Sequence, residues 1–251
     1  MISASLIISF FVLEIALLAR ATRGGFLSKF PLFYSYIAYM LISGAIATGL
    51  YLWAPASYPS GAWFRLVFGL VVEFAVLAEV SDHIFRPYPA IHLLGRLLIV
   101  SLCIAFFSLY IFPSLAEARS SDYTILNLLK TTSLAKAAII IALLAAARSY
   151  RLPLGLNISG MMLGFSIYLA VNVANFALAE HYGPALYGKT FSVVGPLSYT
   201  LALLVWTASL WRWEPAFPVV RQIPAGNQRD GEPLSCELGR FNTALTRILR
   251  R

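Results

Sequence analysis

VVEFAVLAEVSDHIFRPYP, residues 71–89, begins as an apolar helix and ends in charge, imidazole and proline. Glu73 lies inside the apolar part, several turns before the polar end. A residue that precedes a proline disfavours the helical conformation, so the two prolines at 87 and 89 predict a turn. The stretch therefore predicts the end of a membrane helix that carries one carboxylate far from that end.

The rest of the chain has the composition of a protein with several membrane spans. Of its 251 residues, 59% are hydrophobic and 12% are charged, and the mean hydropathy is +0.76. A soluble domain carries about twice that share of charge. Lys and Arg number 19 against 11 Asp and Glu. Basic cytoplasmic loops account for this excess better than nucleic-acid binding does, so no nucleic-acid partner is expected.

Apolar blocks of the length needed to cross a bilayer recur along the chain. A hydrocarbon layer of about 30 Å needs about 20 helical residues. The blocks predict seven transmembrane helices at residues 3–20, 31–54, 62–84, 91–113, 123–147, 156–180 and 191–212. The expected fold class is therefore all-α, a polytopic membrane protein with a seven-helix bundle over residues 1–213.

Basic residues lie mainly at one set of helix ends. Before the C-terminal tail, that set holds Arg20, Arg23, Lys29, Arg86, Arg96, Arg148 and Arg151, and the opposite set holds Arg65, Arg119 and Lys189. Cytoplasmic loops are enriched in Lys and Arg. The pattern predicts a multi-pass inner-membrane protein with its N-terminus outside and its C-terminus in the cytoplasm.

The tail after the last span changes character. Residues 214–233 are polar and rich in Pro and Gly, which predicts a flexible linker. Residues 234–251 place apolar side chains at helical spacing among Arg240, Arg247, Arg250 and Arg251. They predict a basic amphipathic helix on the anionic inner leaflet of the lipid bilayer. Docking of this segment on the bundle or on a partner remains the alternative.

Glu73 and Lys136 are charged residues predicted near the middle of the membrane. Such a charge costs at least about 2.5 kcal/mol on insertion scales, so a partner or a function is expected. A helix rises about 1.5 Å per residue, which places Glu73 about 13 Å and Lys136 about 18 Å from the cytoplasmic face. Two interpretations stay open: a pair that lines a polar pocket or an ion path, and an ion pair that only sets helix packing.

Further polar residues are predicted within the spans. They are candidates for the lining of a polar cavity: Glu14, Lys130, Asn172, Asn175 and Tyr199. Asn172 and Asn175 share a helix face, and with Tyr199 they are expected either to extend a polar cavity toward the outside or to bond neighbouring helices together.

A second cluster is predicted at the cytoplasmic interface: Glu79, Asp82, His83, Arg86 and His92. No HExxH, no CxxC and no His pair at i, i+4 accompanies it, so no metal, zinc in particular, is expected there. The simpler interpretation is a helix that ends in charges at the headgroup level.

The sequence lacks the residues by which known families of membrane proteins bind retinal or haem. The seven-span topology resembles that of the microbial rhodopsins, but residues 191–213 hold no lysine to form a retinal Schiff base. Haem-binding cytochromes need facing histidines within the membrane, and no predicted span has one at its middle. No cofactor is predicted: not retinal, haem or zinc.

An aromatic-rich stretch FPLFYSYIAYMLISG (30–44), the acidic residue Glu73 and the turn HIFRPYPAIHLLGR (83–96) occur together. In these features the chain resembles a group of seven-span bacterial inner-membrane proteins, over residues 30–96. The resemblance implies a bacterial inner-membrane location and supplies no activity to carry over.

Three functions are consistent with the sequence. The first is a sensory, scaffold or accessory component that binds a lipid, a small ligand or a protein partner, with contacts through the cytoplasmic loops and tail. The second is a proton- or ion-coupled carrier that uses Glu73 and Lys136. The third is a lipid-modifying enzyme at the cytoplasmic face, for which Glu79, Asp82, His83 and Arg86 would be the acid–base and phosphate-contacting groups. No catalytic motif supports enzyme activity, and no catalytic residue is assigned.

Overall fold

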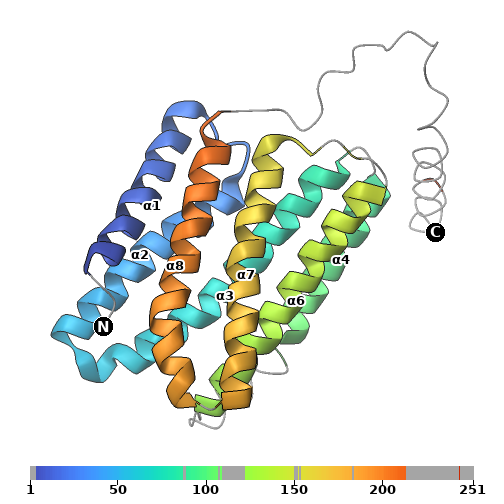
Figure 1. Ribbon diagram of the computed structural model, residues 1–251. Helices are drawn as coiled ribbons and strands as arrows, with labels where there is room; N and C mark the ends of the chain where they lie inside the picture. The colour runs from blue at the N-terminus through green and yellow to red at the C-terminus, as the bar shows by residue number, and fades with distance from the viewer. Residues whose placement is uncertain are drawn as a thin grey trace.

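The protein is an all-helical bundle in the computed structural model of Figure 1. The structure describes residues 4–86, 89–106, 108, 122–149, 152, 154–182, 184–212 and 243. Over these residues, seven long helices follow one another: α1 (Ala4–Gly24), α2 (Pro31–Trp53), α3 (Tyr58–Phe85), α4 (Pro89–Phe106), α6 (Asp122–Ser149), α7 (Leu156–Tyr182) and α8 (Pro184–Leu210). Successive helices run in opposite directions across the bundle (Figure 1).

The predicted spans coincide with these helices, with two notable differences at their starts. Helix α3 begins at Tyr58 rather than residue 62, directly after a 3₁₀ turn over Pro55–Ser57. Helix α8 begins at Pro184 rather than residue 191, so Lys189 belongs to its first two turns. Hydropathy marks the apolar middle of a helix, and these helices continue past it into polar sequence. The predicted linker and tail, 214–251, lie outside the described residues apart from residue 243.

The helices form a membrane protein with several spans. In the described residues, five segments are long and apolar enough to cross a bilayer: Pro31–Trp53, Gly61–Phe85, Leu129–Ser149, Leu156–Leu178 and Val193–Leu210. Helix α4 contributes a shorter apolar segment, Gly95–Ala105. Large apolar side chains such as Ile42, Phe64 and Ile141 are exposed on the outside of the bundle. A bilayer solvates such a surface, whereas water would not.

Helix α3 is the central element of the bundle. It packs against α2, α4, α6 and α7, whereas α1 packs on α2 and α8. Helix α7 makes its most extensive contact with α8. A change in the position of α3 therefore affects four neighbours at once.

The α7–α8 contact depends on small residues. The Trp206 indole on α8 lies over Gly164 on α7, where a Cβ atom would collide with the ring. Its Nε1 donates a hydrogen bond of 3.1 Å to the carbonyl of Met161. Membrane helices pack closely where glycine removes the side chain. Gly164 thus sets the distance between α7 and α8.

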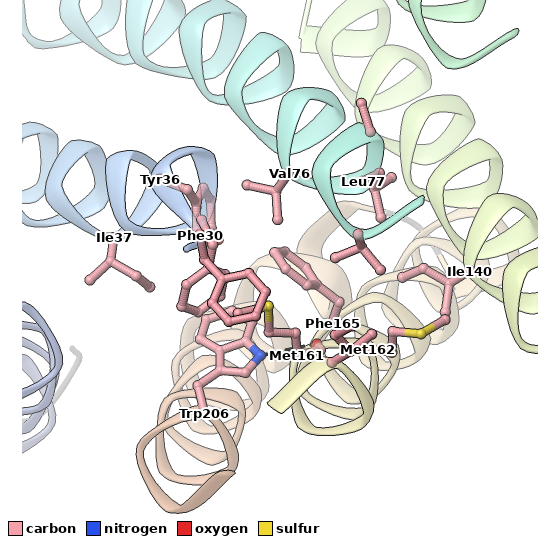
Figure 2. Packing of buried hydrophobic residues seen from close by; sticks show 14 of the residues in the cluster. Phe30, Tyr36, Ile37, Val76, Leu77, Ile140, Met161, Met162, Phe165 and Trp206 are labelled. Carbon is pink, nitrogen blue, oxygen red and sulfur yellow. Dashed lines mark hydrogen bonds between the residues drawn. The ribbon is translucent and has the colours of Figure 1, made fainter. Parts of the chain in front are cut away.

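An aromatic layer fills the half of the bundle in which α2 begins and α8 ends (Figure 2). The Trp206 ring lies 5.4 Å from the Phe33 ring and 4.8 Å from the Phe165 ring, centroid to centroid. Tyr36 packs on Phe165 at 5.6 Å. All four side chains are almost completely buried. We call Phe33, Tyr36, Phe165 and Trp206 the aromatic layer.

Candidate functional site

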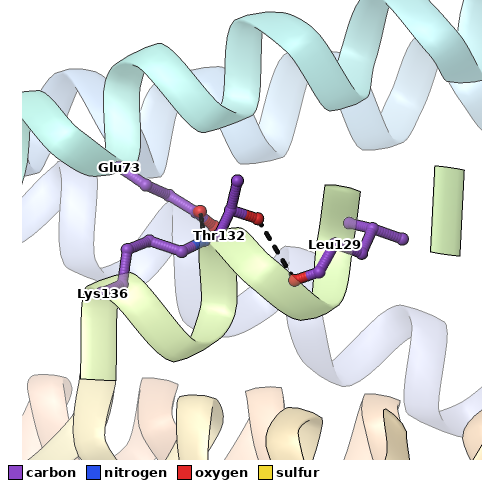
Figure 3. A network of polar contacts seen from close by, with 4 residues as sticks. All are labelled: Glu73, Leu129, Thr132 and Lys136. Atoms are coloured by element: carbon purple, nitrogen blue, oxygen red, sulfur yellow. Dashed lines mark hydrogen bonds and ion pairs between the residues drawn. The ribbon is translucent and has the colours of Figure 1, made fainter. Parts of the chain in front are cut away.

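The structure brings Glu73 and Lys136 together (Figure 3). Lys136 Nζ of α6 donates a hydrogen bond to Glu73 Oε2 of α3, and the two charges form a salt bridge. Glu73 lies about 18 Å from the Phe85 end of α3 at 1.5 Å per residue, near the middle of the helix. The side chains are 9% and 16% exposed for Lys136 and Glu73, so the pair is largely removed from its surroundings.

The pair lies at a cavity of about 300 Å³ between α2, α3, α6 and α7, which is lined by both apolar and polar side chains. Helical spacing places the lining residues of each helix on one face. Those of α6 are Leu129, Thr132, Ser133 and Lys136, at i, i+3, i+4 and i+7. Those of α7 are Tyr168, Asn172 and Phe176, at i, i+4 and i+8. The polar part of the lining comes from four helices that are distant in sequence.

The cavity occupies one half of the bundle. Its lining begins at Tyr58, in the first turn of α3, and reaches Glu73 at the middle of that helix. On α7, the lining residues follow Phe165 of the aromatic layer toward the opposite end of the helix. The aromatic layer therefore separates the ion pair from the end of the bundle where α3 ends. The arrangement is a polar recess with a charged floor and an apolar barrier behind it.

Arg65 adds a second cation to the lining. It lies two turns before Glu73 on α3, and Gly69 lies between them on the same face. The Tyr39 hydroxyl donates a hydrogen bond to the Arg65 carbonyl, which ties α2 to α3 beside the guanidinium. From the sequence, Arg65 was predicted only as a charge at a helix end. The spacing Arg65–Gly69–Glu73 was the available signal, because three cavity-facing positions at i, i+4 and i+8 form one stripe.

Of the five residues predicted to extend a polar cavity, the structure places only Asn172 in its lining. Asn175 is 3% exposed, and neither of its side-chain polar atoms has a hydrogen-bond partner among the residues that the structure describes. Lys130 is half-buried one helix position after Leu129. The prediction treated one helix face as one cavity, but neighbouring helices cover part of the α7 face.

Glu14 and Tyr199 form a separate buried pair. The Tyr199 hydroxyl of α8 donates a hydrogen bond of 2.6 Å to Glu14 Oε1 of α1. Both residues are buried, and neither lines the cavity. Their hydrogen bond joins α1 to α8, as in the alternative that such residues bond neighbouring helices together. The Tyr168 ring, which does line the cavity, lies 5.8 Å from the Tyr199 ring.

The predicted cytoplasmic-interface cluster is divided among different contacts. Both carboxylate oxygens of Glu79 accept backbone N–H bonds, from Leu32 at 2.9 Å and from Phe33 at 2.8 Å. Glu79 is therefore a buried cap for the first turn of α2, where N–H groups lack partners within the helix. The carboxylate is thus buried between helices at this end of the bundle, and it has a structural partner that the sequence did not predict. A carboxylate on a neighbouring helix satisfies an N-terminus that has no side-chain cap of its own.

The other members of that cluster lie nearer the surface. Asp82 of α3 pairs with His92 of α4 at 2.9 Å, with both side chains about one-third exposed. His83 Nδ1 lies 2.9 Å from the Glu79 carbonyl, and its ring lies 4.7 Å from that of Phe30. Arg86 is exposed. Among the described residues, no three His, Cys, Asp or Glu side chains are grouped to hold a metal ion.

Comparison of the chain with protein-family models, curated proteins and solved structures found no match. Functional inference therefore depends on the geometry of the recess. The tail arginines Arg240, Arg247, Arg250 and Arg251 lie outside the described residues.

Proposed function

We propose that this chain is a seven-span inner-membrane protein of the sensory or accessory type, which binds a small ligand in the recess between α2, α3, α6 and α7. Its N-terminus lies outside and its C-terminus in the cytoplasm. The observation that carries the proposal is the ion pair Glu73–Lys136 at the floor of a cavity of about 300 Å³. That volume is at the lower end of the range for small-molecule sites.

The distribution of basic residues supports this orientation. The turn between α2 and α3, at the Tyr58 end of the cavity, carries no Lys or Arg over residues 54–64, and Arg65 is the first basic residue after it. The turn between α1 and α2 carries Arg23 and Lys29. The positive-inside rule puts the turn between α1 and α2 in the cytoplasm. In that orientation the recess faces the outside.

The ligand contacts would be few and polar, within a largely apolar bundle. Thr132, Ser133 and Asn172 present hydroxyl and amide groups beside the ion pair. A site of this kind fixes the orientation of a ligand through a small number of convergent polar groups. Thr132 also bonds the Leu129 carbonyl at 3.2 Å, so its hydroxyl has an anchored position (Figure 3).

Helix α3 offers a route from the recess to the cytoplasmic end. Its first half lines the cavity from Tyr58 to Glu73. Its second half holds the start of α2 through Glu79 and contacts α4 through the Asp82–His92 pair. A ligand that shifts α3 would change both contacts. Coupling between two sites needs such a shared element.

Native mass spectrometry of the full chain, extracted in mild detergent, tests the proposal. We expect a retained small molecule in the wild type and its loss in Ser133→Phe, which fills the recess. Ala138→Phe is the matched control, because Ala138 lies on the exposed side of α6. A retained molecule that is unaffected by Ser133→Phe, or no retained molecule at any detergent concentration, would contradict a ligand site here.

A proton- or ion-coupled carrier is the second candidate, and the position of the ion pair favours it. Glu73 and Lys136 are titratable groups that line the recess, as in proton relays within membranes. Carriage predicts pH-linked flux in proteoliposomes that is lost in Glu73→Gln. Flux that persists unchanged in that variant would remove Glu73 from the mechanism. The geometry gives less support to a lipid-modifying enzyme, because both Glu79 oxygens cap α2.

A further inference from the structure

A second, apolar crevice adjoins the recess. It has a volume of about 240 Å³ and lies between α2 and the first half of α3. Tyr39, Ala47 and Arg65 line both cavities, so the two spaces meet at these side chains. Ile46, Phe64 and Phe68, which line the crevice, are each about 60% exposed on the outer surface of the bundle. The crevice therefore opens toward the lipid, and the recess holds the polar groups.

Arg65 is the charge at the junction. Its guanidinium makes no salt bridge and no hydrogen bond within the described part of the chain. It interacts electrostatically with Glu14, but Glu14 Oε1 accepts the Tyr199 hydroxyl. Lys136 is paired with Glu73 on the recess floor. A guanidinium in this position can bind a carboxylate or a phosphate through two parallel hydrogen bonds.

We propose that the ligand of the recess is an anionic amphiphile with a single alkyl chain, and that it enters from the bilayer. Its anionic head lies in the recess, where Arg65 binds it on the side away from the ion pair. Its chain passes the junction at Tyr39 and Ala47 into the α2–α3 crevice and continues into the lipid. This inference deepens the proposed function and depends on it. The apolar crevice provides a place for a chain that a water-soluble anion does not have. The exposed rings of Phe64 and Phe68 at its mouth would face the lipid chains of a bilayer.

Binding of palmitate to the purified full chain in nanodiscs of zwitterionic lipid tests this inference. Saturable binding is expected for the wild type. Arg65→Gln weakens it about tenfold or more, equivalent to about 1.4 kcal/mol, and Arg65→Lys weakens it less. Ala47→Phe, which fills the junction without changing a charge, weakens it to a similar degree. Controls are Arg86→Gln, an exposed arginine at the far end of α3, and Ala45→Phe, on the exposed side of α2.

Two further probes separate the head from the chain. Hexadecanol has the chain without the charge, and inorganic phosphate has the charge without the chain. We expect neither to compete with palmitate at comparable concentration. Competition by phosphate with no effect of Ala47→Phe would overturn the amphiphile and indicate a soluble anion. Equal binding of hexadecanol would overturn the role of Arg65. Absence of saturable palmitate binding would also overturn the inference.

The two proposals fail in different ways. If palmitate does not bind but a native ligand is lost in Ser133→Phe, the recess is a ligand site and only the ligand class is wrong. If no ligand is retained and neither Arg65→Gln nor Ala47→Phe changes palmitate binding, the recess itself is not a site.

Discussion

At the scale of single residues, the Glu73–Lys136 pair has two consequences for stability. Each charge offsets the unfavourable transfer of the other into the bundle, so the loss of one leaves the other without compensation. The loss of both charges leaves no uncompensated charge in the bundle. Polar pairs in membranes otherwise contribute modestly, because the unfolded chain in lipid also finds partners. The asymmetry between single and double variants is therefore the informative quantity.

We expect Lys136→Met and Glu73→Gln each to lower the free energy of unfolding, with Lys136→Met lowering it by about 3 kcal/mol because it leaves a buried carboxylate. The double variant recovers much of this loss. The free energy of unfolding is measured in SDS-containing mixed micelles for the wild type, the two single variants and the double variant, which form a double-mutant cycle. Additive losses in the double variant would mean that the two residues are not partners.

Glu79 has a different task at the same scale. It caps α2 through two backbone N–H bonds. Glu79→Ala removes both acceptors, and we expect a loss of about 1–2 kcal/mol, the effect of losing a helix cap. Faster hydrogen exchange at Leu32 and Phe33 is the direct measurement. Glu79→Gln keeps one acceptor oxygen, so its stability and exchange rates should lie between those of the wild type and Glu79→Ala. Unchanged exchange in Glu79→Ala would show that the cap does not hold α2.

At the scale of helices, the contact between α7 and α8 is limited by Gly164 and the Trp206 indole. Gly164→Ala forces the ring or the helices apart, and we expect destabilisation of about 1–3 kcal/mol, the usual effect of overpacking. Gly44→Ala is the matched control, because its Cβ would lie 3.8 Å from Phe11, an ordinary contact. Thermal unfolding in detergent compares the two, and equal melting temperatures would contradict this role for Gly164.

Sequence reasoning predicted the helices better than the contacts between them. Apolar blocks mark a span whatever its neighbours, so hydropathy located the seven helices of the described residues, apart from the starts of α3 and α8. Depth along the helices also suggested Glu73 and Lys136 as partners, because both lie near the middle. Glu79 could not be assigned in this way. Its partners are 46 and 47 residues away, on a helix start that has no capping side chain of its own.

The recess shows the same limit. Arg65, Ser133 and Tyr168 look ordinary in sequence, since only the packing of α2, α3, α6 and α7 makes them neighbours. Glu14 and Tyr199 look like cavity residues, but α1 and α8 pack together and enclose them. Helical periodicity gives the face on which a side chain lies. The neighbour that covers this face depends on the whole bundle.

At the scale of the whole molecule, the orientation in the membrane is open to a direct test. Alkaline phosphatase fused after Ser57, in the turn between α2 and α3, should be active because that turn is predicted outside. The same enzyme fused after Ser28, in the turn between α1 and α2, should be inactive. Green fluorescent protein fused at these two sites should give the opposite pattern. Active phosphatase at Ser28 and inactive phosphatase at Ser57 would reverse the proposed topology.

In the proposed orientation, the aromatic layer would also determine where the membrane voltage falls. Water in the recess would carry the potential of the outer solution down to Glu73 and Lys136, so the field would be concentrated across Phe33, Tyr36, Phe165 and Trp206. A charge that crosses the full potential exchanges about 2.3 kcal/mol for every 100 mV. An anion bound at Arg65 would cross almost none of it. Its affinity would then be nearly the same in an energised and a depolarised cell, while the layer keeps the bundle electrically tight.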